Sequence, residues 1–231
     1  MRRDGGFTLV ELLVIVAIIA ILLSLLAPSF TAILLRVEMV NCQSNLHQIG
    51  VALSQYQSAH DNRFMPFRQW IRGGWYTDRN GLHDGLIYPY VLNDEFFLCP
   101  TFKRACDPAA VRSYVMTWNF GCTETYWWNL GDWGEGKSID TVLQVKNPAA
   151  LGIVTEEATY TIPGYSTFTM NDAHLVAPDW PYRDTMANFH YPGAGDIRTQ
   201  IEGVANVVFV DGHVDFNTTD KTPYVLTQKW Y

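Results

Sequence analysis

Six acidic and histidine side chains in the second half of the chain have the chemistry of metal ligands. They are Glu156, Glu157, His190, Asp211, His213 and Asp215. Strand ends and a hairpin turn could bring several together, and the candidate ligands are Glu157, His190, Asp211 and His213. Calcium prefers carboxylate and carbonyl oxygens, whereas zinc and manganese accept histidine. The pattern favours a structural alternative, in which Asp211 serves turn geometry and His213 and Asp215 face solvent.

Four cysteines, at positions 42, 99, 106 and 122, offer redox or metal chemistry. Outside the cytoplasm, Cys99 and Cys106 are close enough in sequence to close a small disulfide loop, with Cys122 as a rival partner. Cys42 lies on an apolar helical stripe and is expected to be a buried thiol. Zinc is disfavoured because there is no C-x-x-C pair.

Aromatic residues make up 14% of the chain and are densest between Tyr126 and Trp133. Trp127 and Trp128 lie in this glycine-containing segment, beside polar side chains. Exposed tryptophans would suit stacking on a glycan or anchoring an exported protein. The alternative is that they fill the core of a loop-rich domain.

The chain has no recognisable enzyme signature. It lacks a phosphate-binding loop, a dinucleotide-binding glycine fingerprint, a nucleophile elbow and an H-E-x-x-H zinc motif. The adjacent carboxylates of Glu156 and Glu157 are weak support for a glycosidase without a known separation. We therefore expect a protein that is not an enzyme.

Glu11 is an ionisable residue at the start of a long apolar run. From Leu12 to Ala27 only Ser24 is polar. A helix from Phe7 to Ala27 would be about 31 Å long, enough to cross a bilayer. Arg2 and Arg3 precede the run, so the positive-inside rule places Met1 in the cytoplasm and the rest outside. A cleaved signal peptide is disfavoured because Pro28 follows the obvious cleavage position.

The segment Gly6-Phe7-Thr8-Leu9-Val10-Glu11, followed by the apolar run, resembles the type IV prepilin signature. The resemblance implies that a prepilin peptidase removes residues 1–6 and methylates the new amino group of Phe7. Glu11 would then be the fifth residue of the trimmed chain. A buried carboxylate needs a partner, and in a filament the Phe7 ammonium of a neighbouring subunit could supply it.

After Pro28 the sequence predicts an amphipathic continuation of the same helix over residues 29–60. Its apolar stripe has alternating spacings of four and three residues and comprises Leu35, Met39, Cys42, Leu46, Ile49, Leu53 and Tyr56. We expect the stripe to pack on the chain's own globular domain, residues 61–231. The helix should end near His60-Asp61-Asn62, before Pro66.

The globular domain shows strand-like runs at 113–118, 151–155 and 205–210. Asp211-Gly212 lies between apolar runs and predicts a hairpin with a type I′ turn, in which both residues have positive φ. The predicted fold class is α+β and pilin-like: the long helix lies on a mainly antiparallel sheet with long loops.

The order of four segments in this half resembles large bacterial pseudopilin-like families. The segments begin at Cys42, Phe97, Ser113 and Asn206. Those families have a histidine before the Asp-Gly hairpin, and His190 is the best candidate here, although it lies further from Asp211 than their pattern has it. Related pseudopilins bind calcium in a loop of this domain, so the resemblance implies calcium as a structural ion; no other cofactor is expected.

The composition sets limits on function. A net charge of −7 argues against a general nucleic-acid binder, and a second membrane span is not evident. The leading prediction is a structural subunit of a type II secretion-like pseudopilus or a type IV pilus-like filament. It would sit in the inner membrane as a single-pass protein, with other pilin subunits, prepilin peptidase, an assembly platform and the lipid bilayer as partners. The alternatives are a membrane-anchored binding module that uses the Trp-rich segment, and a tethered metal-dependent hydrolase that uses His190 and Asp211.

Overall fold

The computed structural model describes residues 8–72, 76–105, 108–117, 120–121, 139–157, 174–175, 186–187, 190 and 203–218. The chain divides into two compact units, Met1–Val37 and Glu38–Tyr231. We call these the amino-terminal unit and the head, and describe each by itself.

One long helix, α1 (Leu9–Ala59), supplies the secondary structure of the amino-terminal unit and the first element of the head. The predicted helix is confirmed, with its start at Leu9 rather than Phe7. The helix ends where Asp61 and Asn62 adopt left-handed backbone angles, with φ of 53° and 58°. The carbonyl of Gln57, in the last turn of the helix, accepts from the amides of His60 over 3.1 Å and Asn62 over 2.9 Å, in place of a continued helical pattern.

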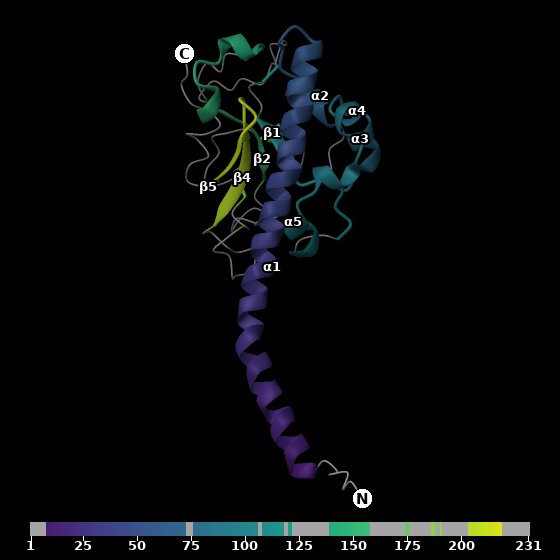
Figure 1. The fold of residues 1–231 in the computed structure, drawn as a ribbon. Coiled ribbons are helices and arrows are strands. Elements are labelled where there is room, and N and C mark those ends of the chain that lie inside the picture. The colour runs from purple at the N-terminus through teal and green to yellow at the C-terminus, as the bar shows by residue number, and fades with distance from the viewer. Residues whose placement is uncertain are drawn as a thin grey trace, which may run out of the picture. The chain divides into compact units, whose positions relative to one another are not determined.

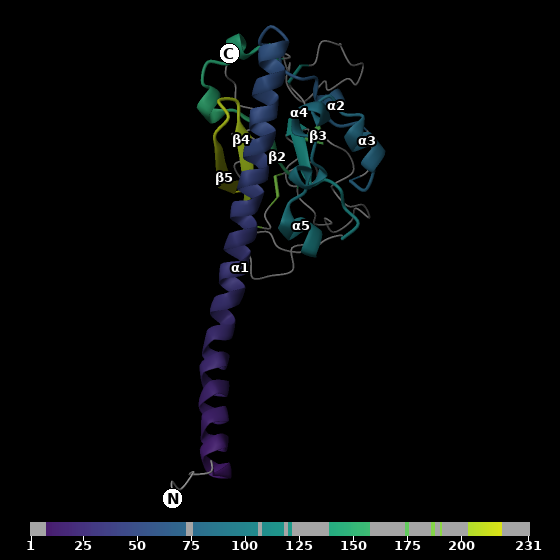
Figure 2. The same ribbon diagram turned by 45° about the vertical axis from the view of Figure 1, so that its right-hand side comes forward.

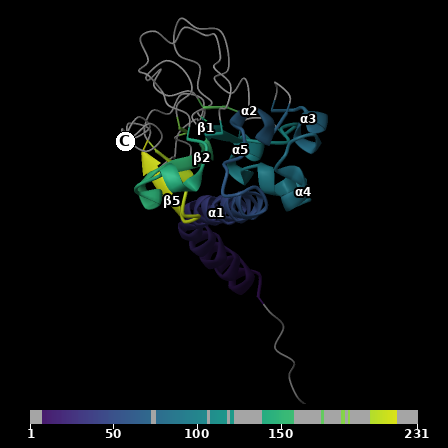
Figure 3. The same cartoon turned by 90° about the horizontal axis from the view of Figure 1, so that it is seen from above.

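Within the head, the apolar stripe of α1 faces the protein interior. Cys42, Leu46, Ile49, Leu53 and Tyr56 are all buried, as the helical spacing predicts. This part of α1 runs alongside β4 and β5 (Figure 1), and the view from above places it against one face of the sheet (Figure 3).

The sheet has five strands in the order β3-β1-β2-β4-β5. Their bounds are Tyr114–Thr117 (β1), Gly152–Glu156 (β2), His174–Leu175 (β3), Val204–Phe209 (β4) and Val214–Thr218 (β5). Neighbouring strands are antiparallel except β1 and β3, which are parallel. All residues of the three central strands β1, β2 and β4 are buried. The predicted α+β class and the three predicted strands are confirmed.

Short helical segments connect α1 to the sheet and β1 to β2. They are α2 (Phe67–Trp70), α3 (Arg79–His83), α4 (Tyr88–Val91), η1 (Asp94–Phe97), α5 (Pro100–Ala105), η2 (Val142–Gln144) and η3 (Pro148–Ala150). Helices α2 to α5 gather on the opposite side of α1 from β5 (Figure 2). Their buried aromatic residues, including Phe67, Trp70 and Phe97, extend the core of the head beyond the sheet.

The predicted hairpin is present, but its turn type differs from the prediction. Phe209 donates to the carbonyl of His213, which leaves a three-residue loop, and Gly212 donates to the carbonyl of Phe209. Gly212 has a φ of 89°, whereas Asp211 is not among the described residues with positive φ. This is the pattern of a type I turn followed by a left-handed glycine, which a three-residue hairpin loop favours over type I′.

Candidate functional site

The first turn of α1 is closed by reciprocal hydrogen bonds between Thr8 and Glu11. The Glu11 carboxylate accepts from the backbone amide of Thr8 over 2.9 Å and from its hydroxyl over 2.7 Å. The backbone amide of Glu11 donates to the Thr8 hydroxyl over 3.3 Å. This arrangement is a capping box, which satisfies amides that the helix leaves unpaired. Glu11 therefore has a partner within its own chain.

The apolar side chains of the amino-terminal unit lie on every side of α1. From Leu9 to Leu26, the large hydrophobic side chains with described exposure are between 41% and 79% exposed. Leu9–Leu26 has a mean hydropathy of 3.1 and is long and apolar enough to cross a membrane. A helix that is hydrophobic all round needs an apolar environment, such as a bilayer or a bundle of similar helices. The predicted processing residues Gly6 and Phe7 lie outside the described part of the chain.

The head contains a buried polar cluster, which we call the buried cluster. Its members are Cys42, Cys99, Glu156 and His190, and one potential ligand atom from each lies within 4.8 Å of all the others. Glu156 Oε1 lies 2.8 Å from His190 Nε2 and accepts from Cys42 Sγ over 2.8 Å. The Cys99 sulfur lies 3.6 Å from His190 Nε2.

Four separate parts of the fold supply these side chains. Cys42 comes from the apolar stripe of α1 and Cys99 from the residue before α5. Glu156 ends β2, and His190 forms an isolated bridge with Val204 at the start of β4. All four residues are at least 98% buried. The cluster thus lies where the helix, the sheet and two connecting segments meet.

Neighbouring groups hold the cluster in position. The backbone amide of Asn206 donates to Glu156 Oε2 over 2.9 Å, which orients the carboxylate. The hydroxyl of Tyr114 donates to the Cys42 sulfur over 3.2 Å. The Ser113 hydroxyl accepts from the backbone amide of Cys99 over 2.7 Å. Such surrounding hydrogen bonds are typical of sites whose geometry must be preserved.

Glu156 and His190 form a buried ion pair. Burial disfavours the charged form of each, but the opposite charge of its partner outweighs burial. The pKa of Glu156 is therefore lowered, and Glu156 raises the pKa of His190 to about 10. Burial raises the pKa of the Cys42 thiol well above its ordinary value.

The structure does not bring the four predicted metal ligands together. His190 is in the buried cluster, whereas Asp211 and His213 pair with each other over 2.6 Å on the exposed β4–β5 turn. Glu157 is buried and lies beside Met186 in an isolated bridge. Adjacent strand residues point to opposite faces, so Glu156, rather than Glu157, joins His190. His190 is buried, whereas Asp211 lies on the exposed turn. The structure therefore does not bring together the two residues that the hydrolase alternative would use.

The cysteines also differ from the prediction. Cys42 is a buried free thiol, as predicted. Cys99 is likewise a buried free thiol rather than half of the predicted Cys99–Cys106 disulfide, and its sulfur lies 3.6 Å from His190 Nε2. Cys106, Trp127 and Trp128 lie outside the described residues.

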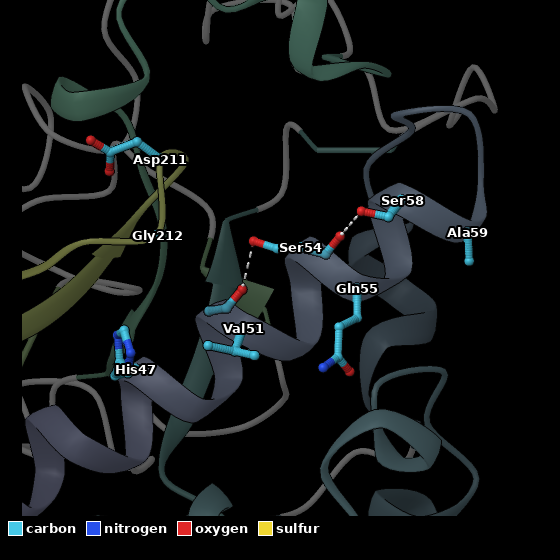
Figure 4. A pocket seen from close by; sticks show the side chains of 9 residues that line it. His47, Val51, Ser54, Gln55, Ser58, Ala59, Asp211 and Gly212 are labelled. Atoms are coloured by element: carbon cyan, nitrogen blue, oxygen red, sulfur yellow. Dashed lines mark hydrogen bonds between the residues drawn. The ribbon is translucent and has the colours of Figure 1, made fainter.

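A shallow groove runs over the head where α1 passes the β4–β5 turn (Figure 4). Its lining includes His47, Val51 and Gln55 from α1, together with Asp211 and Gly212. Two serines of the groove use their hydroxyls on the helix itself: Ser54 donates to the carbonyl of Gly50 and Ser58 to that of Ser54. These two hydroxyls therefore already have partners within α1, and the groove marks where α1 lies beside the β4–β5 turn.

Comparisons with known proteins bear on the amino-terminal features. A family model described as the prokaryotic N-terminal methylation motif matches residues 1–27. The chain carries a prepilin-type N-terminal methylation motif. The predicted resemblance is thereby confirmed, and the matched residues include Gly6, Phe7 and Glu11.

One curated relative extends the similarity beyond the motif. The ComG operon protein 3 homolog of Bacillus licheniformis is 29% identical over 78 residues, which cover 34% of this chain and 79% of that protein. No solved structure shows a significant match to the chain. The similarity thus covers about a third of the chain.

Proposed function

We propose that the protein is a structural subunit of a pilin-like filament, either a type II secretion-like pseudopilus or a type IV pilus-like fibre. The observation that carries the proposal is the combination of the methylation motif with an apolar helix exposed on all sides. The similarity to the ComG operon protein 3 homolog supports it. Packing of such helices against one another would bury their apolar surface in the filament.

Biogenesis follows from the same features. The chain inserts with Arg2 and Arg3 in the cytoplasm and the head outside. Prepilin peptidase cuts after Gly6 and methylates Phe7, and an inner-membrane platform adds the trimmed subunit to other pilin subunits. The mass of the amino-terminal peptide tests this step: we expect a peptide that begins at N-methylated Phe7. A mature protein that begins at Met1 would contradict the proposal.

Glu11 has two roles in this proposal, and the capping box allows them to be separated. Glu11→Gln keeps an N3 side chain that can accept from the Thr8 amide but removes the negative charge. Thr8→Val removes the hydroxyl of the cap but keeps the charge of Glu11. If Glu11 pairs with the Phe7 ammonium of a neighbouring subunit, Glu11→Gln should reduce incorporation into sheared filaments by about tenfold or more. Thr8→Val should reduce it much less.

Membrane insertion is the control for both variants. We expect each to remain in the membrane fraction at the wild-type level, because neither adds a charge to the apolar run. If Glu11→Gln assembles normally while Thr8→Val does not, the role of Glu11 is to cap its own helix, and the pairing between subunits is excluded.

A further inference from the structure

We propose that the buried cluster is a structural zinc site, with Cys42, Cys99, Glu156 and His190 as its four ligands. This inference concerns the head alone and does not depend on filament assembly. Each residue offers one atom of a type that binds zinc: two sulfurs, one carboxylate oxygen and one imidazole nitrogen. All four side chains are buried, which is typical of a closed structural site rather than a catalytic one with an open position.

The spacing of the donor atoms suits a small tetrahedral ion. Zinc bonds of about 2.0–2.3 Å at tetrahedral angles place ligand atoms about 3.3–3.8 Å apart. The Cys99 sulfur and His190 Nε2 already have this separation, at 3.6 Å. The two contacts of Glu156 Oε1, each 2.8 Å, would lengthen by about 0.5–1 Å because the ion takes the place of the protons in these hydrogen bonds. Cys42, Cys99 and His190 would each release a proton to solvent on binding, which leaves two thiolates, a neutral imidazole and a carboxylate as the ligands.

The ligand set selects the metal. Thiolate sulfur and imidazole nitrogen are soft or borderline donors, which favour zinc and disfavour calcium or magnesium. The calcium ion implied by the family resemblance does not fit these four residues. Zinc is also redox-inert, so a zinc ion enclosed by the core would have a purely structural role.

The surrounding hydrogen bonds fit a metal site. The backbone amide of Asn206 holds Glu156 Oε2, which leaves Oε1 to contact Cys42 and His190. The Tyr114 hydroxyl donates to the Cys42 sulfur, as it would to a metal-bound thiolate. These contacts are the outer shell that orients zinc ligands and tunes their basicity.

The ion would connect parts of the head that are far apart in sequence. It would join α1 to the end of β2, to the residue before α5 and to the bridge at the start of β4. Since the unfolded chain cannot offer these four atoms together, zinc would bind the folded head selectively and stabilise it.

The test is the zinc content of the full chain, purified in detergent from cells grown with zinc. We expect about one zinc ion per chain by elemental mass spectrometry. Cobalt(II) should replace it and give the visible absorption of a tetrahedral site together with a sulfur-to-cobalt charge-transfer band. Cys99→Ser and His190→Gln should weaken zinc binding by at least about tenfold. Cys122→Ser and His213→Gln are the matched controls and should keep the ion.

A second measurement keeps the proposal testable if the ligand variants do not fold. A zinc chelator should lower the melting temperature of the wild-type protein, and added zinc, but not calcium, should restore it. Peptide mapping without reductant should find Cys42 and Cys99 as thiols. A wild-type protein that binds neither zinc nor cobalt, or that contains a Cys42–Cys99 disulfide, would overturn the proposal.

Discussion

Glu38 shows how one carboxylate of α1 holds a distant segment of the head. It accepts from Arg104 Nε over 2.7 Å and from Arg104 Nη2 over 2.8 Å, and Thr101 donates to it over 3.0 Å. The hydrogen bonds from Arg104 keep the pKa of Glu38 below its ordinary value. The Arg104 side chain is 54% exposed, so solvent weakens the pair.

Glu38→Gln should lower the free energy of unfolding by about 0.5–1 kcal/mol at pH 7. Because the pKa of Glu38 is lower in the folded state, its contribution is complete above the unfolded pKa of about 4.3 and is lost as the pH falls through the folded value. Urea denaturation of both proteins between pH 7 and pH 3 measures this. The exposed Glu95→Gln is the control, and a difference that persists at the lowest pH would contradict the explanation.

Individual residues were predictable where their signal is local. Glu11 stands out because a charge in an apolar run is costly. For that reason the sequence predicts a partner for the Glu11 carboxylate in a second subunit. The spacing Thr8-x-x-Glu11 is also the sequence pattern of a capping box, which the structure contains. The buried cluster was not predictable, since Cys42, Cys99 and Glu156 have no short spacing that links them. Only the packing of α1 on the sheet brings them together.

Among the elements, the β4–β5 hairpin has a backbone requirement at one position. Gly212 has a φ of 89°, and a Cβ there would meet no atom within 4 Å. Any penalty for a side chain therefore comes from the backbone conformation and not from crowding.

Gly212→Ala should lower the free energy of unfolding by about 1–2 kcal/mol, measured by chemical denaturation. Gly212→Asn should lose clearly less, because asparagine tolerates left-handed angles. Equal losses for the two variants would mean that side-chain contacts, and not φ, determine the cost.

The contact between α1 and β4 depends on a second glycine. A Cβ at Gly50 would lie 3.1 Å from Val208 Cγ1 and 3.6 Å from the carbonyl oxygen of Gly212. The helix therefore approaches the sheet closely at this point, and a larger side chain would push the two apart.

Gly50→Leu should lower the free energy of unfolding by about 1–3 kcal/mol because it overpacks this contact. Gly50→Ala should be nearly neutral, since the gain in helix propensity, about 1 kcal/mol, offsets a tight contact. The exposed neighbour Val51→Leu is the control. Full stability of Gly50→Leu would show that the contact is not close in solution.

The elements were predictable to different degrees. The buried stripe from Cys42 to Tyr56 follows from its spacing, because a helical period reports which face is covered. The predicted turn type was wrong because Asp-Gly occurs both in two-residue hairpin loops with a type I′ turn and in three-residue loops with a type I turn. The choice between them depends on which residues pair across the strands, here Phe209 and His213, and that register is set by the whole sheet.

For the whole molecule, the apolar surface of Leu9–Leu26 should determine where the protein resides. Replacing Ile18 and Ile19 with arginine adds about 5–7 kcal/mol to the cost of insertion. The Leu, Ile and Val residues of the run together gain roughly 4–7 kcal/mol on insertion, so the two arginines would offset most of that gain. We expect much of this variant to leave the membrane pellet on alkaline extraction. The variant with leucine at both positions should stay, and an unchanged distribution of the arginine variant would contradict single-helix anchoring.

The capping box has a consequence for subunits that wait in the membrane before the proposed assembly. Before any neighbour arrives, the acid of Glu11 already accepts two hydrogen bonds from Thr8, so a waiting subunit holds no bare charge. Polymerisation would then exchange one set of bonds for another instead of creating a wholly new one. In the proposed filament, such an exchange would make the net free energy contributed by Glu11 much smaller than the strength of either set of bonds, so that burial of the apolar helices would supply most of the driving force for assembly.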